Sequence, residues 1–288
     1  MSRTVIVVPC FNEARRLDLR ALETYAARAD AAELLFVNDG SRDETLDILR
    51  RLHADHPRRI RYLDLDRNGG KAEAVRQGIL QAIASRPDYV GFWDADLATP
   101  LDDIAGFARV LDAEPRVEIV IGTRLPLLGH RIDRQPLRYW LGRLFANVAS
   151  LALSVRIFDT QCGAKLFRVT DETAALFAQP FRTRWIFDVE IFARLAHARR
   201  RTERPQLREL LYEYPLDRWR DVAGSSVKRG DFVKAAGELA SIYWAYLRPG
   251  AVGPHGAPPP TPIKPPTVAP PAVVPSAAPS QRSDQKAA

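Results

Sequence analysis

The chain of 288 residues is 46% hydrophobic and carries a formal net charge of +7, with 42 lysines and arginines against 35 aspartates and glutamates. This suits one large globular domain or two halves that share a sheet, and the charge favours acidic partners such as nucleotides, phosphorylated lipids, membrane surfaces or nucleic acid, unless it serves solubility alone. The two cysteines, Cys10 and Cys162, lie far apart and outside any CxxC or Cys/His cluster, which argues against a disulfide framework or zinc site and favours a reducing cytoplasm.

Apolar runs in the sequence are short. The N-terminal run, Thr4–Val8, is too short for a signal peptide. The longest weakly charged stretch, Leu144–Val155, covers about a dozen residues, whereas a helix that crosses a bilayer needs about 20. We therefore expect a soluble or peripheral protein without a transmembrane segment.

Strand-like and helix-like segments alternate in the first half. Five β-branched or aromatic runs predict buried strands, at Thr4–Val8, Glu33–Asn38, Ile60–Leu65, Tyr89–Asp94 and Val117–Gly122. Helical patterns lie between the first four of them, at Glu13–Ala29, from about Asp43, and at Lys71–Ser85. This order predicts an α/β fold with a mainly parallel sheet flanked by helices, which binds ligands beyond the carboxyl ends of its strands.

The second half has a different pattern. Helices are predicted at Leu137–Ser154, Asp171–Phe177, Phe187–Arg199 and Asp231–Leu247, and a strand at Leu207–Pro215. Beyond Pro249 the chain is rich in proline and alanine, and this composition predicts disorder.

Polar residues follow each of the first five predicted strands. The clusters are Pro9–Glu13, Asn38–Ser41, Asn68–Lys71, Asp94–Asp96 and Gly122–Arg124. Each alone reads as a turn with a helix cap, but five on one edge of a parallel sheet predict a single crevice. Neither GxGxxG nor GxxxxGK[ST] occurs, which argues against a dinucleotide-binding Rossmann site and a P-loop.

The clusters belong to longer motifs: "IVVPCFNE", "FVNDGSRDET", "NGGKAEAV", "DADLATP" and "GTR". Together they resemble the family 2 glycosyltransferases of GT-A fold. The segments "DTQCGAKLFR", "RWIFDVEI" and "GSSVK" look like the dolichyl-phosphate glucosyltransferase and mannosyltransferase branch, which moves a sugar from a nucleotide sugar to a polyprenyl phosphate. The resemblance covers Val5 to Lys228. It implies a GT-A domain over 1–248, with a nucleotide-sugar-binding half at 1–125 and an acceptor-binding half at 126–248, followed by the tail 249–288.

A divalent cation is the first consequence of the resemblance. A nucleoside diphosphate leaves readily only when its developing charge is neutralised, and Mg²⁺ binds through one or two carboxylates plus phosphates and water. Asp94 and Asp96 are implied as catalytic ligands of Mg²⁺ or Mn²⁺, with Asp96 facing the metal and Asp94 the metal or the ribose. Ala98 stands where mannosyltransferase relatives have a metal-binding glutamine, and the "DADLAT" form is closer to the glucosyltransferase branch.

The resemblance also implies a nucleotide site. Base and ribose contacts fall on residues after the first two strands: Pro9, Asn12, Glu13, Asp39, Gly40 and Ser41. Lys71 is expected near the nucleotide, although a solvated helix start explains it as well. An aspartate can accept a hydrogen bond from uracil or from guanine, so Asp39 leaves the base open.

The acceptor site is expected from the second half. Arginine forks bind phosphates, which suits Arg124, Arg134 and Arg138, and Arg124 is also expected to be catalytic. Lys228 with Ser225 is a further candidate for phosphate binding. Other implied acceptor residues are Asp159, Gln161, Gly163 and Trp185. Asp188 would be the base for a hydroxyl acceptor, but a phosphate monoester is already mostly dianionic at pH 7, so there it would orient the pocket or its arginines. Cys162 is expected to be a small buried residue.

Two aromatic-rich helices raise the question of a membrane. Leu137–Ser154 could present an apolar face to lipid, and Trp244 and Tyr246 lie between Lys234 and Arg248. Ordinary core packing is the alternative for both helices. We expect a peripheral protein at the cytoplasmic face of a membrane.

The function predicted is an inverting, metal-dependent transfer of glucose from UDP-glucose to a polyprenyl or dolichyl phosphate. The alternatives are GDP-mannose as donor, a hydroxyl acceptor, and a nucleotide- or nucleic-acid-binding protein without catalysis. The Asp94 and Asp96 pair argues against loss of catalysis, and the lack of clustered basic residues with interleaved aromatics argues against nucleic acid.

Overall fold

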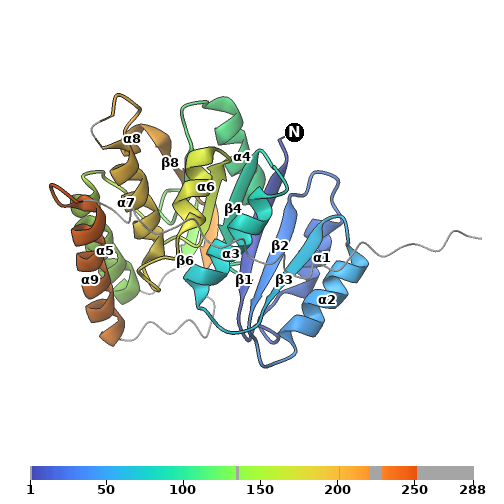
Figure 1. The fold of residues 1–288 in the computed structure, drawn as a ribbon. Coiled ribbons are helices and arrows are strands. Elements are labelled where there is room, and N and C mark those ends of the chain that lie inside the picture. Colours follow the sequence, from blue (N-terminus) through green and yellow to red (C-terminus); the bar gives the residue numbers. More distant parts are fainter. Residues whose placement is uncertain (1, 134–135, 201, 221–228, 252–288) are drawn as a thin grey trace, which may run out of the picture.

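The computed structural model describes residues 2–133, 136–200, 202–220 and 229–251, which surround one central sheet (Figure 1). The strands in these residues are β1 (Thr4–Cys10), β2 (Glu33–Asp39), β3 (Ile60–Leu65), β4 (Tyr89–Trp93), β5 (Ile119–Thr123), β6 (Arg131–Asp133), β7 (Ala164–Arg168), β8 (Leu211–Pro215) and β9 (Arg218–Arg220). The helices are α1 (Leu19–Ala26), α2 (Thr45–Asp55), α3 (Lys71–Ile83), α4 (Asp103–Ala113), α5 (Pro136–Leu153), α6 (Asp171–Ala178), α7 (Phe187–Arg199), α8 (Leu207–Leu210), α9 (Arg229–Ile242) and η1 (Tyr243–Leu247).

The main sheet is mostly parallel. Among the described residues its order is β3-β2-β1-β4-β7-β5-β8, and β7 runs antiparallel to both neighbours while the other pairs are parallel. Ala164 of β7 lies opposite Trp93 of β4, so β7 begins at the edge where the parallel strands end. The segment before β7 therefore joins the carboxyl edge of the sheet. This topology confirms the predicted fold class.

Alternating strand residues supply two cores. Val5 and Val7 of β1 face a core formed with α3, α5, α6, α7 and α9, whereas Ile6 and Val8 face a core formed with α1, α2 and α4. All four side chains are fully buried, as a strand covered on both faces requires. Figure 1 shows α5, α7 and α9 grouped at one end of the sheet, and α1 and α2 at the other.

Several element boundaries differ from the sequence prediction. The first helix begins only at Leu19, because the Asp18 side chain accepts a hydrogen bond from the Ala21 amide and caps it there. The predicted strand at Leu207–Pro215 starts as α8, where Gln206 and Glu209 form a capping box. Neither α4 nor β7 was predicted.

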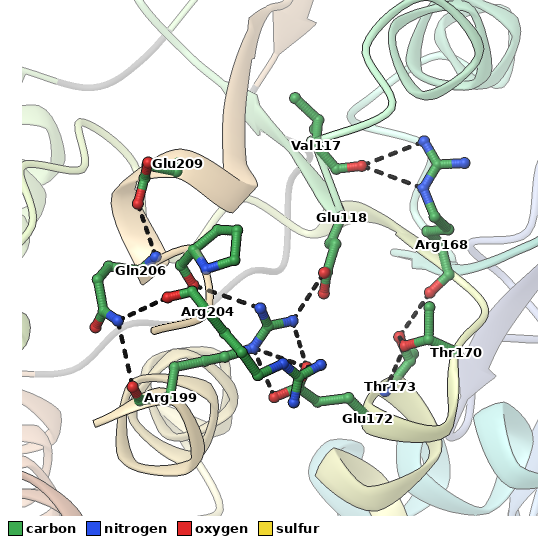
Figure 2. A network of polar contacts seen from close by, with 11 residues as sticks. Val117, Glu118, Arg168, Thr170, Glu172, Thr173, Arg199, Arg204, Gln206 and Glu209 are labelled. Atoms are coloured by element: carbon green, nitrogen blue, oxygen red, sulfur yellow. Dashed lines mark hydrogen bonds and ion pairs between the residues drawn. The ribbon is translucent and has the colours of Figure 1, made fainter. Parts of the chain in front are cut away.

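An ion network ties the helices to the amino edge of the sheet (Figure 2). Arg199, at the end of α7, is 2% exposed and donates to Glu118 before β5 and to Glu172 of α6, both at 2.8 Å. Its carbonyl accepts from the Gln206 side chain. Because Glu118 precedes β5, the network lies at the edge opposite the predicted site. We infer that it holds α6 and α7 in place.

Candidate active site

The predicted polar clusters meet at the carboxyl edge of the sheet. One cluster lies at or just after the carboxyl end of each of β1 to β5. Because these strands run in the same direction, the five clusters lie at the same edge of the sheet. The segment Asp159–Gly163 reaches the same edge because it precedes the antiparallel β7. Residues spread from Pro9 to Gly163 are thus brought together, as predicted.

Asp94 is held by a lysine and by a neighbouring backbone. Lys71 Nζ, at the start of α3, lies 2.5 Å from Asp94 Oδ1, and the Asp94 amide donates to the Gly163 carbonyl at 3.0 Å. A Cβ atom at Gly163 would stand 1.9 Å from Asp94 Oδ2. The surrounding protein removes part of the water around the Lys71 ammonium and opposes its charge, but the carboxylates of Asp94 and Asp188 outweigh this and raise the pKa of Lys71.

Asp96 follows in a strained turn. Its Oδ1 accepts from the Ala98 amide at 3.1 Å, and Leu97 between them has φ of 49°. Burial and then the Asp94 charge raise the pKa of Asp96. Arg16 Nη2 stands 3.7 Å from Asp96 Oδ2 and offsets part of this repulsion.

Glu13 adds a third carboxylate beside the two aspartates. Arg16 Nη1 donates to Glu13 Oε1 at 3.1 Å, whereas Glu13 Oε2 is buried and has no hydrogen-bond partner in the part of the chain that the structure describes. Burial raises the pKa of Glu13, and the charges of Asp96, Asp43 and Asp94 add to this. The added negative charge favours a cation near Asp94 and Asp96, although Glu13 does not form a metal-ligand group with them among the described residues.

The described residues offer few protein ligands for a metal ion. In the described residues, no three or more His, Cys, Asp or Glu side chains are grouped so that they could hold a metal ion. Asp94 and Asp96 therefore fit an ion that takes its other ligands from substrate phosphates and water, which is the habit of Mg²⁺. Ala98, with no side-chain oxygen, is consistent with this.

Asp39 holds the loop that leads to Lys71. Its carboxylate accepts from the amides of Gly69 at 2.7 Å and Gly70 at 2.8 Å, and the residue is 2% exposed. Gly40 lies so close to the same loop that a Cβ atom there would stand 2.6 Å from the Asn68 amide nitrogen. Asp39 thus positions the start of α3, and its contact with a nucleotide remains a prediction.

The loops after β1 and β2 are joined through Asn12 and Ser41. The Asn12 amide donates to Ser41 Oγ at 3.0 Å, and Asn12 Oδ1 accepts from the Arg42 amide at 2.9 Å. Pro9 lies within β1 opposite Val37. The predicted base and ribose residues are therefore adjacent, but their role as ligand contacts stays a prediction.

Two predicted acceptor residues bind each other. Arg124 donates to Asp159 through Nε at 2.5 Å and Nη2 at 2.7 Å, and its guanidinium lies 5.0 Å from the centre of the Trp219 ring. Asp159 is held in turn, since Glu213 of β8 accepts from its amide at 3.1 Å. The Arg124 fork is thus engaged inside the protein.

Asp188 has a partner that sequence reasoning missed. Lys165 Nζ, on β7, lies 2.5 Å from Asp188 Oδ1 and donates to the Cys162 carbonyl at 2.7 Å. Lys165 is fully buried and Asp188 is 5% exposed. Asp188 therefore binds a lysine, and its expected role in orienting the acceptor pocket or its arginines stays a prediction. Cys162 is buried as expected, and burial raises the pKa of its thiol to about 11.

The other predicted acceptor residues have mixed outcomes. Trp185 is 46% exposed, and Gln161 is partly buried before β7. Arg134, Ser225 and Lys228 lie outside the described residues, as does the side chain of Arg138. Arg16 and Lys165, which the sequence analysis did not single out, contact the predicted site residues Asp96 and Asp188. A charged residue inside the apolar run of β7 was the feature of the sequence that could have pointed to a buried partner for Lys165.

Comparison with known proteins gives consistent results. The model of the family "Glycosyl transferase family 2" matches residues 5–172. A dolichyl-phosphate beta-glucosyltransferase of Trichomonas vaginalis is 34% identical over 260 residues, which cover 86% of this chain and 72% of the relative. The enzyme of the same name from Saccharomyces cerevisiae is 30% identical over 270 residues, covering 84% and 74%.

Solved structures share the fold at low sequence identity. Glucosyl-3-phosphoglycerate synthase from Mycobacterium tuberculosis, in complex with Mn²⁺, UDP and glucosyl-3-phosphoglycerate, has a TM-score of 0.57 at 14% identity, over 84% of this chain and 78% of that one. A mannosyltransferase from Pyrobaculum calidifontis in complex with GDP-Man and Mn²⁺ has a TM-score of 0.55 at 19% identity, over 85% and 63%. Both likenesses concern the fold.

Proposed function

The chain belongs to glycosyl transferase family 2, and we propose that it transfers glucose from UDP-glucose to a dolichyl or polyprenyl phosphate. The names of the relatives from Trichomonas vaginalis and Saccharomyces cerevisiae support both the sugar and the acceptor. GDP-mannose remains the second donor, because a mannosyltransferase bound to GDP-Man has the same fold.

The observation that carries the proposal is the arrangement of Asp94, Asp96 and Lys71 at one strand end. The two carboxylates fit a divalent cation, Mg²⁺ or Mn²⁺, which when bound neutralises charge on the leaving diphosphate. Lys71 Nζ lies 2.5 Å from Asp94 and is half-exposed, so its ammonium can also reach a phosphate placed beside that carboxylate. Both metal and lysine would then stabilise the leaving group.

The surroundings of Asp188 support a phosphate acceptor. A hydroxyl acceptor needs a general base within hydrogen-bond reach, whereas a phosphate monoester is already mostly dianionic at pH 7. Asp188 is 5% exposed and engaged with Lys165, which suits a residue that holds the site together better than a proton acceptor. The inverting attack would come from the phosphate oxygen itself.

The surface of α5 supports attachment to a membrane. Its exposed side chains include Trp140 (70% exposed), Leu144 (62%), Val148 (47%) and Leu151 (82%). At about 100° per residue they fall within a sector of about 80° on one face of the helix. Among the helices in the described ranges, none has the length and apolar character needed to cross a bilayer. We propose that α5 lies flat on a membrane surface, and the cytoplasmic face stays a prediction.

The C-terminal helix requires one correction. Tyr246, predicted to face lipid, is 1% exposed and donates to Glu190 Oε1 at 3.0 Å in the core. Trp244 is 62% exposed, and Arg248 stacks over its ring at 5.2 Å. Trp244 and Arg248 therefore remain the membrane-facing pair of this segment.

A direct assay tests the proposal. Purified protein is given UDP-glucose or GDP-mannose, Mn²⁺ and a short polyprenyl phosphate, and the glycolipid is identified by mass spectrometry. We expect glucosyl phosphoprenol from UDP-glucose. Product from GDP-mannose alone would show that the proposed donor is wrong. Product only with a hydroxyl acceptor would show that the proposed acceptor is wrong. Absence of product with every pair would support the non-catalytic alternative.

A further inference from the structure

The side chain of Arg184 covers the start of α3, next to the Lys71–Asp94 ion pair. A Cβ atom at Gly70 would stand 3.1 Å from Arg184 Nη2 and 3.4 Å from its Nε. Gly70 directly precedes Lys71 and adopts φ of 89°, so it lets the guanidinium approach the backbone closely. Arg184 thus reaches the donor side of the site from the second half of the chain.

The backbone of Arg184 is fixed from behind by α9. Glu238 accepts hydrogen bonds from three consecutive amides, those of Arg184 at 3.1 Å, Trp185 at 3.1 Å and Ile186 at 3.0 Å. A carboxylate that binds backbone N–H groups makes charge-assisted hydrogen bonds. This contact holds the segment before α7 while leaving the Arg184 side chain exposed.

No described residue supplies a counter-charge to the guanidinium of Arg184. In the residues that the structure describes, it takes part in no hydrogen bond or ion pair. Other basic side chains of the candidate site each have an acidic partner: Lys71 pairs with Asp94, Arg124 with Asp159 and Lys165 with Asp188. An exposed guanidinium without a partner among the described residues, on a backbone that Glu238 holds, has its fork available for an anion.

We propose that Arg184 binds a phosphate group of a substrate. Guanidinium pairs with phosphate through two parallel hydrogen bonds, which gives both strength and orientation. The inference rests on the proposed function for the identity of that phosphate. It is either the diphosphate of the nucleotide sugar or the monoester of the polyprenyl acceptor, which share this chemistry.

Binding measurements on matched variants test the assignment. Arg184→Met and Arg184→Lys are compared with Arg182→Met, which removes an exposed arginine two positions away in the same segment. Calorimetry in the presence of Mn²⁺ uses UDP, uridine and geranyl phosphate as probes, and thermal unfolding monitors the fold. Turnover of UDP-glucose by the unaltered protein is recorded separately.

We expect Arg184→Met to lower the affinity for one of the two phosphate ligands by about tenfold or more. The affinity of Arg184→Lys should lie between those of Arg184→Met and the unaltered protein. Uridine affinity and the unfolding temperature should match those of Arg182→Met. Loss of UDP affinity identifies the donor diphosphate, and loss of geranyl phosphate affinity identifies the acceptor.

Unchanged affinity for both phosphate ligands, an equal loss for uridine, or no binding of either ligand to the unaltered protein overturns the proposal. If the unaltered protein turns over UDP-glucose but the Arg184 variants bind both phosphate ligands normally, only this inference is refuted. An effect on phosphate binding without turnover would refute only the proposed function.

Discussion

Lys165 of β7 and Asp188 of α7 form a buried ion pair, with 2.5 Å between Nζ and Oδ1. The Phe92 ring lies 5.3 Å from the ammonium, and the Cys162 carbonyl accepts a second hydrogen bond from it. The pair joins the sheet to the first turn of the helix that carries the "FDVE" motif. Charges in such a position are stable only together.

We therefore expect Lys165→Met to destabilise the fold by about 3–5 kcal/mol, because it leaves the Asp188 carboxylate buried without a partner. The double variant Lys165→Met/Asp188→Leu should recover most of this loss in urea unfolding. It should still turn over at least about tenfold more slowly, because the pair no longer fixes β7 and the first turn of α7 beside the site. If the double variant is as unstable as Lys165→Met, then an unpaired Asp188 carboxylate is not the cause of the lost stability.

Removal of one site carboxylate should separate stability from activity. Burial and the charge of Asp94 raise the pKa of Asp96, so its charge costs stability at neutral pH. Asp96→Asn should unfold at the same or a higher temperature, lose Mn²⁺-dependent binding of UDP in calorimetry, and turn over about a hundredfold more slowly or worse. Asp66→Asn, at an exposed position, is the control. Full activity of the unaltered protein in EDTA would refute the metal requirement.

A third prediction concerns Asp103 in the first turn of α4. Burial, followed by the charges of Asp217 and Asp102, raises the pKa of Asp103 to about 6, and its buried Oδ2 has no hydrogen-bond partner among the described residues. Because the folded protein favours the protonated form, protonation of Asp103 contributes to stability. This contribution is complete below the ordinary pKa of 3.8 and is lost as the pH rises to about 6. Wild-type stability should therefore fall across that window.

Asp103→Asn should abolish this fall and stabilise the protein by about 1–3 kcal/mol near pH 7.5, with no gain below about pH 4. Urea unfolding at several pH values measures it, with Asp66→Asn as the matched change. A constant difference between Asp103→Asn and wild type at every pH would contradict the assignment.

The sequence predicted those parts of the site that depend on strand direction. Buried runs such as Thr4–Val8 and Glu33–Asn38 are continuous and are followed by turn residues, so the shared edge could be predicted from the alternation of strands and helices. The family motifs then connected Asp94, Asp96 and Lys71 to nucleotide-sugar chemistry.

Pairings between distant side chains could not be predicted in the same way. Lys165 is charged within a strand, and the carboxylate that offsets its buried charge comes from Asp188, 23 residues later. Asp39 turns inward to amides 30 and 31 residues away. Such contacts depend on how helices pack on the sheet, which local periodicity does not encode.

The face of α5 gives the last prediction. Leu144 and Leu151 are 62% and 82% exposed and lie on one side of the helix, and α5 contacts η1, which carries Trp244. Each leucine that enters the apolar interface of a membrane gains on the order of 1 kcal/mol or more. Arg248 and the net charge of +7 add attraction to anionic lipid, which salt screens.

Leu144→Ser/Leu151→Ser should therefore weaken co-sedimentation with anionic vesicles by about tenfold or more, while turnover of a short, water-soluble polyprenyl phosphate stays within about twofold. Leu19→Ser, which replaces an exposed leucine of α1 at the opposite end of the sheet, should leave vesicle binding unchanged (Figure 1). Binding of the unaltered protein should decline as salt rises. If that protein ignores vesicles and instead forms a dimer in solution that the double change dissociates, then this face joins two copies of the chain, and the membrane assignment is wrong.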